Sequence, residues 1–125
     1  VIGAGPAGSV ASSKLIKEGL KVLVLEKMQF PRFVIGESLL PHSMDYLDEL
    51  NLLPAVEALK FQVKTGACFY HDGERCDFLF ENQFSKGWSY TFQVKRADFD
   101  HALIKEAEKQ GAEVEFQADG SPPDS

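Results

Sequence analysis

A glycine-rich turn near the start of the chain is followed by two hydrophobic patterns within the first 26 residues. Between residues 7 and 18, small and apolar positions recur every three or four residues, which predicts a helix. Gly19 stands where a residue that ends a helix needs a positive φ. Lys21–Glu26 contains the unbroken run Val-Leu-Val-Leu, which is typical of a parallel strand covered on both faces. With the first two residues as the end of a preceding strand, residues 1–26 predict a strand–helix–strand unit with a right-handed crossover.

The middle of the chain combines a long connection with helices and an antiparallel strand. Lys27–Pro41 contains two prolines and little periodicity, and a loop of this length in a compact domain is often functional. Apolar residues three positions apart predict a helix over Ser43–Leu53, and a short helical turn is expected at Pro54–Leu59. Trp88–Lys95 alternates apolar and polar side chains, which predicts an antiparallel strand covered on one face.

A hairpin is predicted where the strand that begins at Phe61 reaches the Asp72-Gly73 turn. In this register Phe69 lies opposite Cys76. Because side chains alternate faces along a strand, Cys68 and Cys76 then point to opposite faces and cannot form a disulfide. Two free thiols fit a reducing, cytoplasmic setting.

The last periodic segment predicts a helix followed by a strand. Phe99–Gln110 carries an apolar stripe, Asp98 is its expected N-cap, and Gly111 is placed to end it. The strand Ala112–Phe116 follows. This order indicates an α/β, Rossmann-type fold with a parallel sheet and an inserted antiparallel segment. The chain divides into the strand–helix–strand unit 1–26, the loop and helices 27–60, the antiparallel strands 61–95, the helix and third parallel strand 96–116, and a loose tail 117–125.

Composition excludes several classes of function. The 125 residues are 44% hydrophobic and 26% charged, as in a globular domain. The net charge of −6 argues against non-specific nucleic-acid binding, which needs Lys and Arg to replace phosphate counterions. No stretch approaches the ~18 apolar residues of a membrane span. The three histidines lie far apart and have no metal-ligand spacing.

The glycine-rich turn Gly3-Ala4-Gly5-Pro6-Ala7-Gly8 matches the G-x-G-x-x-G dinucleotide-binding motif. Gly3 allows the tight turn, Gly5 lets the backbone approach a pyrophosphate, and Gly8 lets helix and strand pack closely. The helix N-terminus, at Pro6 and Ala7, offers free amides and a positive dipole end to the phosphates. Glu26, near the spacing of about 20 residues expected for a ribose-binding acid, disfavours a 2′-phosphate and therefore NADP. FAD and NAD both remain possible at this point.

A second motif distinguishes between them. The segment Phe30–Pro41 reads F-P-R-F-V-I-G-E-S-L-L-P and closely resembles the corresponding segment of flavin-dependent halogenases, which lie within the FAD-dependent monooxygenase superfamily. The resemblance implies FAD as cofactor and places this segment against the flavin. Arg32 can pair with a phosphate or with the edge of the isoalloxazine. Gly36 permits close approach, and Ser38 offers a hydroxyl. The expected FAD contacts thus include Lys27, Arg32, Gly36, Glu37 and Ser38.

A third motif, Phe61–Phe69, resembles the F-x-x-K-x-G-A segment of the same family and places the family's active-site lysine at Lys64. In that family, reduced FAD and oxygen form a flavin hydroperoxide, halide attacks it, and the resulting hypohalous acid reaches the lysine beside the substrate. The lysine then donates a hydrogen bond to the hypohalous acid or carries the halogen as a haloamine. We expect Lys64 to lie in an apolar setting among Phe61, Val63 and Phe69, which would disfavour its ammonium form.

A fourth motif, Val94–Leu103, resembles the R-x-x-F-D-x-x-L helix start of FAD monooxygenases and halogenases. The resemblance implies that Arg96, just before the helix, contacts FAD. Asp98 and Asp100 are interpreted more simply, as cap and first-turn acids that the helix dipole favours.

The resemblance implies the N-terminal part of an enzyme several times longer, so the chain alone is expected to be truncated and inactive. The main hypothesis is an FAD-dependent halogenase that uses an electron-rich aromatic substrate, O2, halide and a separate flavin reductase. One alternative is an FAD-dependent aromatic hydroxylase that uses NAD(P)H. The other is a non-catalytic ADP-binding module.

Overall fold

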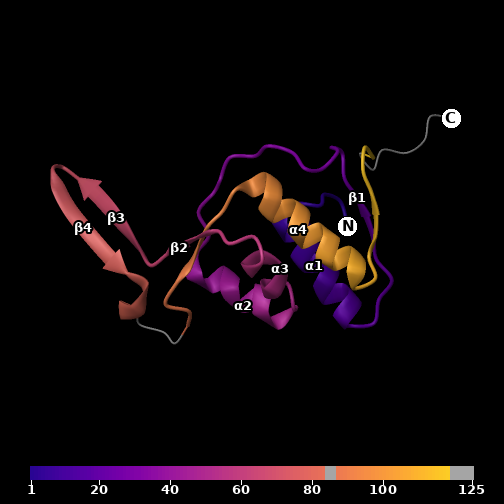
Figure 1. Ribbon diagram of the computed structural model, residues 1–125, viewed down its shortest axis with the longest axis horizontal. Coiled ribbons are helices and arrows are strands. Elements are labelled where there is room, and N and C mark those ends of the chain that lie inside the picture. The colour runs from indigo at the N-terminus through magenta and orange to yellow at the C-terminus, as the bar shows by residue number, and fades with distance from the viewer. Residues whose placement is uncertain (84–86, 119–125) are drawn as a thin grey trace.

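A parallel sheet and two helices form one half of the body of the molecule. The computed structural model describes residues 1–83 and 87–118. Strand β1 (Leu23–Leu25) pairs in parallel with β6 (Glu113–Glu115) and, through a bridge from Leu25, with Ile2. Helices α1 (Pro6–Lys17) and α4 (Arg96–Lys109) lie side by side next to these strands (Figure 1). The predicted Rossmann-type α/β fold is therefore confirmed.

The core between this sheet and the two helices is built by alternate strand positions. Val22 and Val24 are buried, and they belong to a cluster with Ile104 and Ala107 of α4. The residue between the two valines, Leu23, is 45% exposed. In the described part of the chain the helices thus cover one face of β1, and the prediction of a strand covered on both faces was wrong there. An apolar run shows that a strand can be buried, but the segments that cover it come from elsewhere in the chain.

A second, antiparallel sheet lies on the other side of α4. Strands β2 (Gln62–Lys64) and β5 (Thr91–Gln93) pair antiparallel. Ser38 forms an antiparallel bridge with Gln93, and two further backbone hydrogen bonds join residues 37–39 to this stretch: Val94 N to Glu37 O at 2.6 Å and Leu39 N to Phe92 O at 3.3 Å. Residues 37–39 therefore run along the edge of β5 that is opposite β2.

Helices α2 (Pro41–Glu49) and α3 (Leu53–Glu57) pack with α4 and β5 around the larger apolar core. The predicted helix Ser43–Leu53 is wrong in extent, because Asn51 adopts φ 58° and the chain starts a new helix at Leu53. A short polar side chain tolerates this left-handed conformation better than most residues do, and it separates the two helices. Trp88 and Tyr90 pack against the same core, although the strand itself is limited to Thr91–Gln93.

The hairpin of β3 (Gly66–His71) and β4 (Glu74–Leu79) extends away from the body and leads into a 3-10 turn, η1 (Phe80–Asn82) (Figure 1). Its register is the predicted one, with Phe69 opposite Cys76. Asp72 and Gly73 both have positive φ, as a two-residue hairpin turn requires. Both cysteines are free and exposed, which confirms that this register forms no disulfide.

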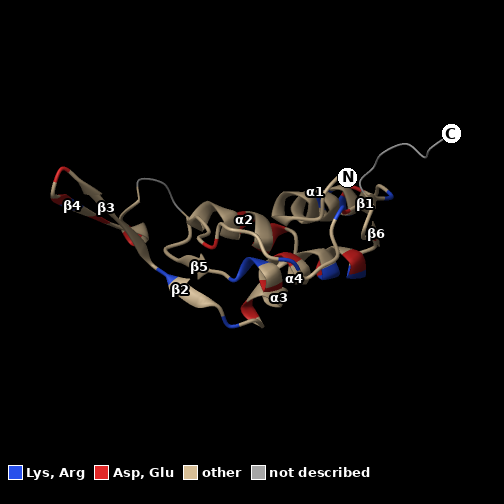
Figure 2. Ribbon diagram, turned by 90° about the horizontal axis from the view of Figure 1, so that it is seen from above, with Lys and Arg blue, Asp and Glu red and all other residues tan. Residues whose placement is uncertain are grey.

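The start of α4 differs from its prediction. The helix begins at Arg96 with Lys95 as its N-cap residue, so Asp98 lies in the first turn and is not the cap. Gly19 and Gly111 have φ of 86° and 123° and follow the C-caps of α1 and α4, as predicted. Basic residues lie on β2 and where β5 leads into α4. Acidic residues lie along helices α2 and α4 (Figure 2).

The predicted tail falls mostly on residues 119–125, which lie outside the described residues. Within 1–83 and 87–118, no helix has the length and apolar character needed to cross a bilayer.

Candidate functional site

The glycine turn joins the first strand to α1 in a conformation that depends on two glycines. Gly3 has φ 94°, a left-handed value that favours glycine. A Cβ at Gly8 would lie 1.9 Å from the carbonyl oxygen of Gly3, so only glycine allows the helix to approach the strand this closely. This is the packing reason that the motif predicts for Gly8. No side chain caps α1, and its first turn carries no acid, which leaves the helix N-terminus open to an anion.

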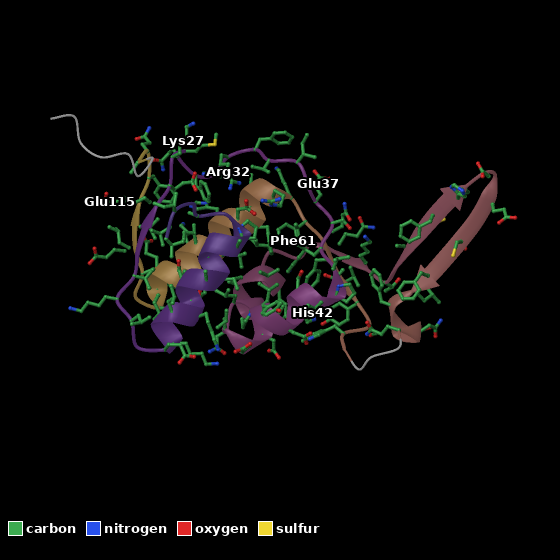
Figure 3. The ribbon with its side chains drawn as sticks, turned by 180° about the vertical axis from the view of Figure 1, so that it is seen from behind. Lys27, Arg32, Glu37, His42, Phe61 and Glu115 are labelled. Carbon is green, nitrogen blue, oxygen red and sulfur yellow. The ribbon has the colours of Figure 1, made fainter. Side chains whose placement is uncertain are left out.

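Glu26 follows β1 at its carboxyl end and is buried. Its Oε2 accepts a 2.6 Å hydrogen bond from Ala4 N in the glycine turn, and its Oε1 accepts a 3.1 Å bond from Met28 N. A carboxylate has about four lone-pair sites, so acceptor capacity remains for a ligand hydroxyl. Lys27, the next residue, is exposed near this end of the sheet (Figure 3).

Asp100 joins the two arginines that the motifs single out. Arg32 Nη1 donates to Asp100 Oδ2 at 2.5 Å, while Arg96 donates from Nε to Oδ1 at 2.8 Å and from Nη2 to Oδ2 at 3.0 Å. Asp100 is fully buried, and both arginine side chains are largely so. The hydrogen bonds with Asp100 raise the pKa of Arg96. The interpretation of Asp100 as a simple first-turn acid was therefore wrong.

The arginine pair lies between the glycine turn and the segment around Gly36. Arg32 Nη2 is 3.5 Å from the position of a Cβ on Gly5, and the Arg32 guanidinium stacks on the ring of Phe30 with its carbon 4.3 Å from the centroid. Arg96 Nη1 donates to the carbonyl oxygen of Gly36 at 3.3 Å. Figure 3 shows Arg32 and Glu37 along the same segment, close to the end of α4 that carries these contacts.

Lys64 contacts the same segment from β2. Its Nζ donates a hydrogen bond to the hydroxyl of Ser38 and lies 5.9 Å from the centroid of the Phe80 ring. The expected apolar setting was wrong in its members, because Val63 and Phe69 are 54% and 63% exposed. Phe61 instead packs edge-on against Phe99. Side-chain alternation explains part of this outcome, since Val63 points to the opposite face from Lys64.

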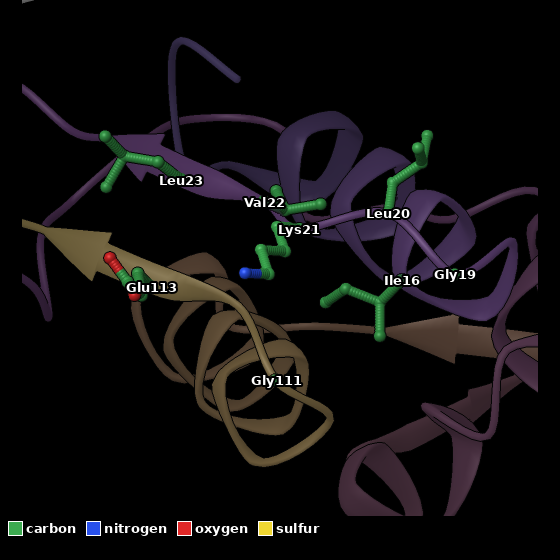
Figure 4. Close-up of a pocket in the computed structure, with 8 residues that line it drawn as sticks. All are labelled: Ile16, Gly19, Leu20, Lys21, Val22, Leu23, Gly111 and Glu113. Carbon is green, nitrogen blue, oxygen red and sulfur yellow. The ribbon is translucent and has the colours of Figure 1, made fainter.

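A large hollow in the molecule lies away from this site. A depression of about 650 Å³ opens at the amino ends of β1 and β6 (Figure 4). Ligands of open parallel sheets bind beyond the carboxyl ends of the strands, where Gly3 and Glu26 lie. We therefore do not assign the depression to the site. Its lining residues are Ile16, Gly19, Leu20, Lys21, Val22, Leu23, Gly111 and Glu113.

The described residues also bear on metal binding. His42 pairs with Asp45, and His71 contacts Asp72 at the hairpin turn. Within the part of the chain that the structure describes, no three His, Cys, Asp or Glu side chains gather as a metal site would require.

The open N-terminus of α1, the carboxylate after β1 and the guanidinium pair beside the turn suit a ligand with a pyrophosphate and a ribose. This arrangement defines a dinucleotide-binding α/β protein. Residues 1–121 match the FAD binding domain family, and the chain belongs to that family. Its cofactor is FAD, which the residues described above fit.

Similar proteins include halogenases. The chain is 45% identical over 114 residues to a tryptophan 2-halogenase of Chondromyces crocatus. The aligned region covers 91% of this chain and 21% of that protein. A flavoprotein/dehydrogenase from Cytophaga hutchinsonii has 55% identity and a TM-score of 0.88, covering 93% of this chain and 29% of that one. The myxobacterial chondrochloren halogenase has 34% identity and a TM-score of 0.83, covering 93% and 27%. The chain thus spans less than a third of the length of these proteins.

Sequence reasoning found the two arginines but missed the acid that joins them. Arg96 and Asp100 are four residues apart on a helix, a spacing at which oppositely charged side chains meet. That signal was available in the sequence. The contact between Arg32 and Asp100 spans 68 residues and had no local signal.

Proposed function

We propose that this chain is the FAD-binding part of a flavin-dependent halogenase that acts on an electron-rich aromatic substrate. The observation that carries the proposal is the hydrogen bond from Lys64 Nζ to Ser38 Oγ. It brings together two halogenase-like motifs that are 26 residues apart in the chain, the segment expected against the flavin and the candidate catalytic lysine. Relatives named as halogenases support the same interpretation.

In this proposal the glycine turn and its surroundings hold the cofactor. Amides of Gly5, Ala7 and Gly8 face the pyrophosphate at the start of α1, where Pro6 has no amide hydrogen to offer. Glu26 accepts hydrogen bonds from the ribose hydroxyls with the lone pairs that Ala4 and Met28 leave free. The other proposed contacts of the cofactor are Gly3, Lys27, Arg32, Gly36, Glu37, Ser38 and Arg96.

When bound and reduced, FAD supplies the electrons that activate O2 for oxidation of halide. The chain's own contribution to the halogenation step is Lys64. Its ammonium already donates to a hydroxyl oxygen, Ser38 Oγ, and it can donate in the same way to the oxygen of hypohalous acid. Such a hydrogen bond polarises the O–X bond and holds the halogen in one place for attack by the aromatic substrate.

The test uses the full-length protein with FAD, a flavin reductase, bromide or chloride, and a panel of electron-rich aromatics. Lys64→Ala should leave the reoxidation of reduced FAD by O2 intact, as followed by flavin absorbance. Halogenated product should fall by about 100-fold or more, since a positioned acid or hydrogen-bond donor contributes on that scale. Lys105→Ala, at an exposed position on α4, is the matched control. Unchanged product formation by Lys64→Ala would contradict the proposal.

An FAD-dependent hydroxylase or dehydrogenase is the second candidate, and the similarity to a flavoprotein/dehydrogenase favours it. A hydroxylase would oxidise NAD(P)H itself and form hydroxylated product without halide. A dehydrogenase would instead take two electrons from its substrate and pass them from the flavin to a separate acceptor. The proposed halogenase instead depends on a separate reductase. A full-length protein that binds no FAD would leave only the ADP-binding module.

The free thiols of Cys68 and Cys76 support a reducing, cytoplasmic compartment.

A further inference from the structure

We infer that Asp100 is a positioning residue of the FAD site, which aims Arg32 at the cofactor's pyrophosphate and fixes the Gly36 segment through Arg96. The inference rests on the FAD contacts set out under the proposed function. None of the four sequence motifs assigns this role to Asp100, whose position in the first half of α4 suggests only an acid near a helix start.

The first argument is the burial of a charge. Asp100 is fully buried, and its carboxylate accepts three hydrogen bonds from the two guanidinium groups at 2.5, 2.8 and 3.0 Å. A buried carboxylate is costly unless it is paired and hydrogen-bonded, and this one meets both conditions. Two arginines held this close would repel each other without the acid between them. Asp100 therefore keeps both guanidinium groups in place, and the cluster retains a net charge of about +1.

The second argument is the direction in which the Arg32 guanidinium points. Asp100 accepts from Nη1 of Arg32, and the ring of Phe30 packs against the guanidinium face. The remaining Nη2 is 3.5 Å from the Cβ position on Gly5, the N-cap residue of α1. Since this helix start has no side-chain cap, an anion there would meet the helix amides and Arg32 Nη2 together.

The third argument concerns Arg96, which contacts the backbone of the Gly36 segment. It uses Nε and Nη2 for Asp100 and Nη1 for the carbonyl oxygens of Ile35 and Gly36, at 3.5 and 3.3 Å. Gly36 has φ 114°, and a Cβ there would be 3.2 Å from Arg96 Nη1. Asp100 thus links the glycine turn to the Gly36 segment through one arginine on each side.

The experiment measures binding of FAD and of ADP to the full-length apoprotein, by quenching of flavin fluorescence and by calorimetry. Asp100→Asn keeps the volume of the side chain but removes its charge. It should weaken FAD and ADP binding by about 10-fold or more, because both ligands carry the pyrophosphate. Asp98→Asn, which changes an exposed acid in the same turn of α4, should change neither affinity.

A double variant separates positioning from a general effect on folding. If Asp100 acts through Arg32, adding Asp100→Asn to Arg32→Gln should cost less than about 2-fold further in ADP affinity. Full additivity of the two losses would overturn the inference. If Asp100→Asn does not fold, Arg32→Lys tests the same inference. A lysine is a point charge that cannot bridge Asp100 and the glycine turn at once, so ADP affinity should again fall.

The remaining outcomes separate this inference from the proposed function. A wild-type protein that binds FAD and ADP, with an Asp100→Asn variant of equal affinity, would overturn the inference alone. A wild-type protein that binds neither ligand would overturn the proposed function together with it.

Discussion

The backbone amide of Ala4 donates a 2.6 Å hydrogen bond to the carboxylate of Glu26, although 22 residues separate the two in the chain. The contact joins the turn after the first strand to the carboxyl end of β1. Because the other oxygen of Glu26 accepts from Met28 N, one buried side chain shapes both backbone segments. Glu26 therefore has a structural task even before a ribose is present.

Glu26→Gln should weaken FAD binding and destabilise the apoprotein. The neutral amide keeps one acceptor oxygen but presents an NH2 group to one of the two backbone amides. The loss of one charge-assisted hydrogen bond predicts about 1–2 kcal/mol less stability and an FAD dissociation constant raised about 10-fold. Urea unfolding and FAD titration of the full-length protein measure the two effects. Glu115→Gln, at an exposed position on β6, should match wild type, and a Glu26→Gln variant that also matched wild type would refute the role of Glu26.

Alanine at Gly8 and at Gly5 should have different consequences. At Gly8 the new Cβ would lie 1.9 Å from Gly3 O, which forces α1 away from the strand and costs about 1–3 kcal/mol or more of stability. At Gly5 the backbone has φ −68° and the nearest contact would be 3.5 Å, so the fold accepts alanine. Gly5→Ala should keep the wild-type unfolding midpoint and lose FAD affinity, because its methyl group would occupy the space proposed for the pyrophosphate. Equal unfolding midpoints for both variants would contradict this distinction.

Ser38→Ala should reduce halogenation more than it reduces FAD binding. The hydroxyl of Ser38 accepts from Lys64 Nζ, and without it the ammonium loses a partner that fixes its direction. A hydrogen bond to a charged group is worth about 1.5–3 kcal/mol, which predicts a fall in product formation of about 10-fold or more. The measurement compares product formation at saturating FAD with the FAD dissociation constant. Ser89→Ala, at an exposed position before β5, serves as control, and a loss confined to FAD affinity would limit Ser38 to its proposed cofactor contact and exclude a role in orienting Lys64.

The thiol of Cys68 should react slowly with iodoacetamide at neutral pH. Its hydrogen bond with Asp77, directly across the hairpin, raises its pKa, so less thiolate is present at a given pH. Asp77→Asn removes the negative charge and should speed alkylation at Cys68, most clearly below the wild-type pKa. Mass spectrometry of the labelled peptide gives the rate. Asp72→Asn at the turn should leave the rate unchanged, and an unaffected rate in Asp77→Asn would show that the carboxylate does not control this thiol.

The sequence predicts the elements whose signals are local. The glycine turn, the Val-Leu-Val-Leu run and the Asp72-Gly73 turn each contain the residues that their conformations require, so their structures were anticipated. The break at Asn51 was missed because the apolar spacing continues from α2 into α3 while the backbone turns left-handed. Periodicity shows which side chains can share a face, and it does not report the φ of a single residue.

The candidate site was predictable in its members but not in their connections. The motifs identified Arg32, Arg96, Ser38 and Lys64 individually. Asp100 and the Gly36 carbonyl connect the arginines across segments 60 or more residues apart, and Lys64 contacts Ser38 from 26 residues away. A buried ion pair of this kind depends on tertiary geometry, which single-sequence patterns do not contain.

Residues 37–39 run beside β5 as a short edge of the same sheet that carries Lys64 on β2. The spacing between the segment expected against the flavin and the candidate catalytic lysine is therefore set by main-chain hydrogen bonds, which do not depend on side-chain identity. Side chains on these strands can change without altering that spacing. Such a scaffold would let a lineage acquire new substrates while the proposed flavin segment and the candidate lysine keep a constant separation.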